Sequence, residues 1–366
     1  MDLGCTTVLS EDVDETDFGE NACHQESEIN KMNQRLNWLK GIACIGIVFI
    51  HIQFPTVFGK LLIAYARAGV ALFFIISGYY SYYSDLEKSF AKNKTRLIRN
   101  LKRTLWAFGI YFVWGLFVRY VGAGWNSVIS WIQSLDWREW TKLIIINEDI
   151  IIGHLWFMLA LIYCYILLLL LEKYQMIKMA YRTAPLLCAI AILFMVYMTG
   201  TGRGGMFIYV RNVWFYGMPM FLAGHYIHHY EQRMNELISV NKIKHLLAVS
   251  LIIIALERCF IGNLQFTLGS IGLAISAFVL ALRYPDIQKS SYLVDLGSKM
   301  SMEIYIYHWI VKDIFIKLST VLNISQKMWF IWSQPVMVLV CTIFMVFVID
   351  KTKDIIFTKY YRWREM

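Results

Sequence analysis

Residues 154–171 read HLWFMLALIYCYILLLLL and contain no Asp, Glu, Lys or Arg. A helix of this length spans the hydrocarbon core of a bilayer, which is about 30 Å thick. Helices are expected rather than strands because backbone N–H and C=O groups in lipid must be paired within their own segment. This stretch therefore predicts an integral membrane protein of the all-α class.

Similar apolar stretches recur along the chain and predict a polytopic bundle of about ten transmembrane helices. The expected spans are residues 37–55, 62–83, 104–121, 154–171, 184–200, 207–228, 246–260, 265–282, 302–321 and 329–349. Residues 122–150 hold four tryptophans, a residue type enriched at headgroup level. We expect this segment to be an interfacial or re-entrant helix.

The composition and the placement of charge agree with this fold class. Only 17% of residues are charged, whereas a soluble domain has about 25%. The net charge of +9 follows the membrane, because Lys and Arg gather in alternate loops as the positive-inside rule requires. The pattern predicts a multi-pass plasma-membrane protein with both termini cytoplasmic, in contact with membrane lipid and with no nucleic-acid partner.

Residues 1–30 differ from the rest of the chain because they hold nine acidic residues and no Lys or Arg. Such a segment cannot bury a core. The predicted organisation is a disordered acidic cytoplasmic tail over residues 1–30, followed by a transmembrane domain over residues 31–366. The seven cysteines show no paired spacing, so neither a disulfide framework nor a zinc site is predicted.

Two ionisable residues, Lys40 and His51, lie eleven positions apart in the first expected span. At helical spacing they share one face and are about 16 Å apart along the axis. His51 would lie near the middle of the bilayer, where an ionisable group is a functional candidate and its imidazole suits proton transfer. A neutral histidine bonded to a neighbouring helix explains the residue equally well.

The chain contains the segments LKGIACIGIVFIH at 39–51, GVALFFIISGY at 69–79 and GSKMSMEIYIYHW at 297–309. Together these three segments resemble the bacterial membrane acyltransferase type 3 family. The resemblance implies an O-acyltransferase that moves an acyl group, acetyl above all, from cytoplasmic acyl-CoA to a hydroxyl. It also implies that the acceptor is an extracytoplasmic cell-envelope glycan or a lipid-linked saccharide, and that the protein modifies polysaccharide.

The resemblance also implies roles for individual residues of this sequence. Its catalytic candidates are Lys40, His51, Glu303, Tyr305 and His308. The family's Arg-x-x-Arg motif, suited to coenzyme A phosphates, fits Arg96 to Arg99 literally or Arg99 to Lys102 with lysine second. The donor-binding candidates are therefore Arg96, Arg99, Lys102 and Arg103, although such a cluster is also an ordinary topology determinant.

Two further segments, GHLWFMLALIY at 153–163 and RNVWFYGMPMFLAGHYI at 211–227, resemble middle helices of the family. They supply the acceptor-binding candidates His154, Arg211 and Asn212 on the outer side. A histidine at the rim is more often a belt residue, and an interfacial arginine can reach headgroups. The residues alone leave these readings open.

The sequence leaves two further questions open. His225, His228 and His229 have a spacing compatible with metal ligands, but no carboxylate or cysteine beyond Glu231 completes a set, so no metal is predicted. Similar membrane regions occur in vancomycin-resistance serine racemases, which makes a transporter of a small molecule such as an amino acid the alternative function, with a scaffold third. The sequence indicates neither the acceptor's identity nor the oligomeric state.

Overall fold

The computed structural model describes residues 33–148, 150–287 and 291–364, and within these ranges all regular structure is helical. The acidic tail predicted over residues 1–30 lies outside the described residues. The elements are α2 (Gln34–His51), α3 (Thr56–Ala66), α4 (Ala68–Tyr79), α5 (Leu86–Ser134), α6 (Trp137–Ile146), α7 (Trp156–Lys173), α8 (Ile177–Gly200), η1 (Gly204–Tyr209), η2 (Val213–Gly217), α9 (Met218–His229), α10 (Glu231–Leu237), α11 (Val240–Phe260), α12 (Leu268–Arg283), α13 (Tyr292–Asp295), η3 (Leu296–Met300), α14 (Ser301–Val321) and α15 (Met328–Arg364).

The helical structure of the described residues confirms the all-α class, and several of these helices are long and apolar enough to fit a membrane protein. Among the described residues, five segments are long and apolar enough by length and composition: Thr56–Tyr79, Leu86–Ser134, Trp156–Lys173, Ile177–Gly200 and Met328–Lys353. A sixth is added if α10 and α11, bent by 91°, count as one span. The total of ten spans and the orientation of the termini stay predictions.

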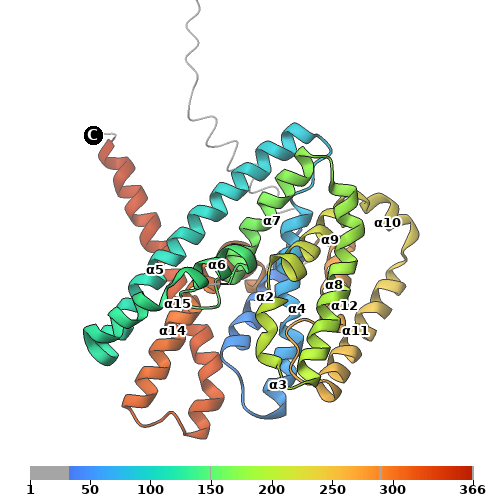
Figure 1. Ribbon diagram of the computed structural model, residues 1–366. Helices are drawn as coiled ribbons and strands as arrows, with labels where there is room; N and C mark the ends of the chain where they lie inside the picture. The colour runs from blue at the N-terminus through green and yellow to red at the C-terminus, as the bar shows by residue number, and fades with distance from the viewer. Residues whose placement is uncertain (1–32, 149, 288–290, 365–366) are drawn as a thin grey trace, which may run out of the picture.

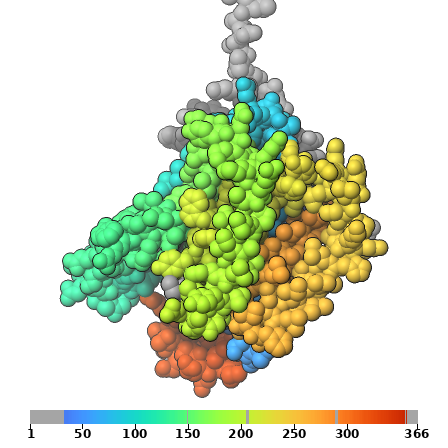
Figure 2. Space-filling model, turned by 45° about the vertical axis from the view of Figure 1, so that its right-hand side comes forward, coloured from blue at the N-terminus to red at the C-terminus, as the bar shows by residue number. Residues whose placement is uncertain are grey.

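Helices α2 and α4 occupy the middle of the bundle in Figure 1, with α8, α11 and α12 on one side and α5, α14 and α15 on the other. Helix α4 packs against α2, α9 and α12. Its residues Phe74 and Ile75 are fully buried. Figure 2 shows α8 on the surface, between the end of α5 and α11. The centre of the bundle is therefore built from the first, second and sixth expected spans.

Small residues allow the central helices to approach closely, as expected for membrane helices. A Cβ atom added at Gly78 would lie 1.8 Å from the backbone oxygen of Phe221, and one at Gly224 would lie 1.9 Å from that of Ile75. Helices α4 and α9 therefore cross in backbone contact. At Gly297 an added Cβ would lie 1.8 Å from the Asn37 oxygen, so η3 fits against the start of α2 in the same way.

The tryptophan-rich segment continues α5 beyond a bend. Ala123 and Gly124 have non-helical backbone angles inside this helix, and Gly124 has a φ of 69°. Helix α6 follows, capped by the Asp136 side chain. Trp125 and Trp137 are exposed, as aromatic residues at a bilayer interface would be. The helical part of the prediction for residues 122–150 is confirmed, and its position relative to a bilayer stays a prediction.

Candidate functional site

Three histidines that are far apart in the sequence meet at one point of the bundle. His51 is the last residue of α2, His308 lies in α14, and His154 precedes α7. The ring centroids of His51 and His308 are 5.2 Å apart, those of His154 and His308 are 5.2 Å apart, and those of His51 and His154 are 6.2 Å apart. We call these three residues the histidine cluster.

The backbone around His154 is fixed by the hydrogen bonds of two side chains. Asn147 adopts a left-handed conformation, donates to the backbone oxygen of Trp156 at 3.1 Å and accepts from the Val213 N–H at 2.6 Å. The Tyr305 hydroxyl donates to the backbone oxygen of His154. These bonds link the segment before α7 to η2 and α14, so His154 is held against the other two histidines.

Hydrogen bonding determines which nitrogen of His308 carries the proton. Its Nδ1 lies 3.1 Å from the backbone oxygen of Ile304. A carbonyl oxygen only accepts hydrogen bonds, so Nδ1 carries the proton. The buried Nε2 atom has no hydrogen-bond partner in the part of the chain that the structure describes. A neutral His308 therefore keeps a lone pair on Nε2 that can accept a proton.

Aromatic rings enclose the cluster and exclude water from part of it. Trp309 stacks on the His154 ring with centroids 5.0 Å apart and an interplanar angle of 7°, and lies 5.1 Å from the His51 ring. The Tyr111 ring, from the middle of α5, lies 4.9 Å from that of His154. His154 and His308 are fully buried and His51 is partly exposed. His51 is therefore the histidine most open to a ligand.

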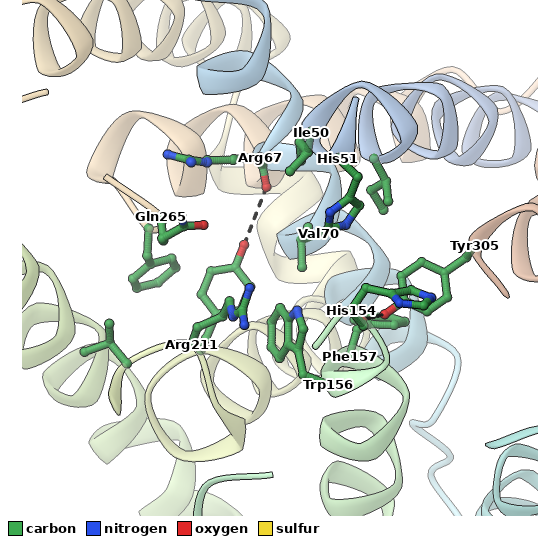
Figure 3. A pocket seen from close by; sticks show the side chains of 14 residues that line it. Ile50, His51, Arg67, Val70, His154, Trp156, Phe157, Arg211, Gln265 and Tyr305 are labelled. Atoms are coloured by element: carbon green, nitrogen blue, oxygen red, sulfur yellow. Dashed lines mark hydrogen bonds between the residues drawn. The ribbon is translucent and has the colours of Figure 1, made fainter. Parts of the chain in front are cut away.

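His51 and His154 line a pocket, which Figure 3 shows from close by. The pocket contains about 640 Å³ of space between atoms, including space open to solvent. A smaller pocket adjoins it and shares Ile47, Phe157 and Tyr305 with it. The smaller pocket is lined otherwise by Cys44, Phe73, Ser301 and Met302. The cluster is thus reachable through one pocket and lies beside a second.

Two catalytic candidates, Lys40 and Glu303, lie outside the histidine cluster. Lys40 lies eleven residues before His51, and its Nζ donates to Asn37 Oδ1 at 3.3 Å. No ion pair joins Lys40 to Glu303, both of which the structure describes. Glu303 lies in the first turn of α14, where a carboxylate complements the partial positive charge of a helix start. Of the five catalytic candidates, His51, Tyr305 and His308 lie close together.

The acceptor-binding candidates have different environments. His154 and Arg211 line the pocket, whereas the prediction placed His154 at the outer rim rather than in the cluster. The Asn212 side chain accepts from the N–H groups of Trp214 at 3.0 Å and Phe215 at 3.1 Å, and so caps η2. Asn212 shapes the turn that carries Arg211, and its own contacts are with backbone.

The donor-binding candidates lie on α5, which connects the basic segment to the cluster. Arg99, Lys102 and Arg103 are exposed, and half-buried Arg96 donates to Asn93 Oδ1 at 3.2 Å. Tyr111, whose ring contacts His154, follows Arg99 by twelve residues, or about 18 Å of helix. A ligand bound at both places must span that distance.

Four residues near the cluster were not identified from the sequence: Arg67, Tyr111, Trp309 and Lys312. Trp309 follows His308, and Lys312 follows it by one helical turn, with Nζ 3.6 Å from the centroid of the Trp309 ring. That i, i+4 spacing was a usable signal for Lys312. Tyr111 carries no such signal, because its position depends on how α5 packs against α7 and α14.

The histidines of α9 have partners other than a metal. His225 Nδ1 lies 2.6 Å from the Tyr181 hydroxyl, His228 Nδ1 lies 2.6 Å from the Tyr79 backbone oxygen, and His229 Nδ1 lies 2.7 Å from the hydroxyl of Tyr82. No group of three or more His, Cys, Asp or Glu side chains suited to a metal ion occurs among the described residues. These histidines connect α9 to α4 and α8.

Comparison with known proteins gives one finding. A family model described as an acyltransferase domain matches residues 33–350. No curated protein and no solved structure matches the chain. The matched range contains the histidine cluster, the pocket beside it and the basic part of α5.

Proposed function

The chain belongs to the acyltransferase type 3 family, and from that premise we propose that it is an O-acyltransferase of a bacterial plasma membrane. It takes an acyl group, which we propose is acetyl, from cytoplasmic acyl-CoA. The acceptor is a hydroxyl of an extracytoplasmic envelope glycan or lipid-linked saccharide. The observation that supports this most directly is the histidine cluster at the wall of a pocket inside the bundle.

The reaction needs a base for the acceptor hydroxyl, and we assign this role to His51. As the hydroxyl oxygen attacks the thioester carbonyl carbon, its proton passes to the His51 imidazole. The carbon–sulfur bond then breaks, and the same proton passes to the departing thiolate, so coenzyme A leaves as a free thiol. Alternatively, an imidazole nitrogen of His51 attacks the thioester carbonyl carbon, and the carbon–sulfur bond breaks to release coenzyme A as a thiolate. The acceptor hydroxyl then attacks the acyl group, the acyl–nitrogen bond breaks, and the hydroxyl proton passes to the thiolate. Both routes use the same ring and the same pocket.

The neighbouring residues position His51 in this scheme. His308 stacks on the His51 ring and has an Nε2 atom without a hydrogen-bond partner among the described residues, so it can share the proton. Tyr305 is a positioning residue, because its hydroxyl bonds to the His154 backbone. The uncharged pocket at Cys44, Ser301 and Met302 suits a thioester approaching along α2.

Mass spectrometry of envelope glycans from cells with and without the gene tests the function. We expect an acetyl increment on glycan that disappears with the gene and returns with the wild-type copy. Uptake of a radiolabelled amino acid by proteoliposomes without acyl-CoA, combined with unchanged glycan, would instead identify a transporter.

The donor site is tested by the double substitution Arg99→Ala with Lys102→Ala. Removing two exposed cations weakens the attraction for coenzyme A phosphates, so the apparent KM for acetyl-CoA should rise by about tenfold. The measurement is release of free thiol as a function of acetyl-CoA concentration. Lys242→Ala with Lys244→Ala, two exposed cations at the start of α11, is the matched control, and an equal KM in both variants would contradict this donor site.

A further inference from the structure

Arg67, between α3 and α4, is a buried cation that lines the same pocket as His51. Only 7% of its surface is exposed. One terminal nitrogen donates to the backbone oxygen of Leu264, while the buried Nε has no hydrogen-bond partner among the described residues. No carboxylate forms an ion pair with Arg67 in that part of the chain. A buried charge without a counter-charge is costly, so a site for an anion is indicated.

A second guanidinium lines the same pocket. Arg211 lies against two aromatic rings, 5.3 Å from the centroid of Trp156 and 4.7 Å from that of Phe207. Figure 3 shows Arg211 between Trp156 and the part of the pocket that holds Arg67 and Gln265. The lining residues include no Asp or Glu. Arg67 and Arg211 therefore both present guanidinium groups to this pocket.

The acidic residue of α11, Glu257, bonds to backbone N–H groups. Glu257 accepts from the N–H groups of Leu268 at 2.9 Å and Gly269 at 3.2 Å. Its carboxylate therefore caps the start of α12. Its neighbour Arg258 adds a further positive charge close to Arg67 without lining the pocket. The local charge balance favours a negatively charged ligand.

We propose that Arg67 and Arg211 bind an anionic group of the acceptor, a phosphate or a carboxylate carried close to the hydroxyl that is acylated. The proposal rests on the proposed function and adds the charge of the acceptor to it. The planar guanidinium fork matches both anions. A neutral saccharide leaves Arg67 without a counter-charge, so the pocket selects against it.

The arrangement of the two pockets assigns the anion to the acceptor rather than to the donor. The pocket at Cys44, Ser301 and Met302 has no charged lining residue and fits an uncharged thioester. Arg67 and Arg211 lie in the other pocket, formed in part by Val210, Gln265 and Phe266. Tyr305 and Phe157 line both pockets. The reacting oxygen and carbonyl carbon then meet beside His51.

Ligand titration of the purified full-length protein tests the proposal without requiring catalysis. The probes are glucose, glucuronate and glucose 1-phosphate, which share a ring and differ in charge. We expect at least one anionic probe to bind about tenfold or more tightly than glucose, because charge-assisted hydrogen bonds are added. Preference for glucuronate identifies a carboxylate site, and preference for glucose 1-phosphate a phosphate site. Equal affinity for all three, or no binding of either anion, overturns the proposal.

Substitution of Arg67 tests whether this residue causes the preference for an anionic probe. Arg67→Gln should abolish the preference for the anionic probe, whereas Arg258→Gln, which removes a nearby charge outside the pocket, should keep it. Binding of acetyl-CoA at the wild-type level shows that Arg67→Gln is folded. If that variant does not fold, the comparison of the three probes on the wild-type protein still decides. A preference that survives in folded Arg67→Gln overturns the assignment.

The outcomes separate this proposal from the proposed function. Anion binding that depends on Arg67, without any acyl transfer, would leave the anion site standing and remove the acyltransferase. Full acyl transfer to glycan by Arg67→Gln would leave the acyltransferase standing and remove the anion site.

Discussion

Replacing His51 by alanine is expected to lower acyl transfer to glycan by at least about 100-fold, the lower range of what a positioned general base contributes. The variant loses the ring that stacks on His308 and borders the pocket, which is the ring assigned as base or acyl carrier, whereas His154 and His308 are fully buried. Transfer is measured as acetyl label on glycan at saturating acetyl-CoA, with the amount of membrane-inserted protein determined in parallel.

His245→Ala is the matched control for this substitution. His245 is an exposed histidine of α11 whose Nδ1 lies 2.7 Å from the Asn241 backbone oxygen. It lies outside the cluster and the pocket, so acyl transfer should stay at the wild-type level. Wild-type transfer by inserted His51→Ala would remove His51 from the mechanism.

Replacing Gly78 by alanine is expected to destabilise the folded bundle by about 3 kcal/mol, the upper part of the range for overpacking a close-packed interior. The added methyl group would lie 1.8 Å from the Phe221 backbone oxygen. Backbone cannot yield as the end of a flexible side chain can, so α4 and α9 must separate. The consequence should be a marked fall in the thermal unfolding temperature in detergent.

Gly109→Ala is the control, and we expect it to change the stability of the folded bundle in the opposite direction. Gly109 lies in α5, and a Cβ atom added there meets no atom within 4 Å. Alanine favours a helix interior over glycine by about 1 kcal/mol, so this variant should be as stable as the wild type or more so. An unfolding temperature of Gly78→Ala equal to that of Gly109→Ala would contradict the close crossing of α4 and α9.

The sequence predicted the helical membrane fold because apolar runs and small residues are local signals. Gly69 and Gly78 are small residues of the kind that permits close approach of membrane helices. A Cβ added at Gly69 would lie 3.0 Å from the Ala43 side chain of α2, and Gly78 meets α9. Which helices form these pairs was not predictable, because partner choice depends on packing across the whole bundle.

Part of the candidate site was also predictable from local signals. His51, Tyr305 and His308 stand in motifs that can be recognised one helix at a time. His154 was expected at the rim, and only the bonds around Asn147 and Tyr305 explain why it is buried. Arg67 lies between two apolar helices, and no local pattern indicates that it shares a pocket with His51.

Transfer of an acyl group from the inner to the outer side of the membrane is measured most directly in sealed liposomes. Purified protein is placed in liposomes that enclose acetyl-CoA with a labelled acetyl group, and glycan from cells lacking the gene is added outside. We expect labelled glycan outside and free coenzyme A inside, with little label when donor and glycan are on the same side. Label transfer that requires both substrates on one side would contradict transfer across the membrane.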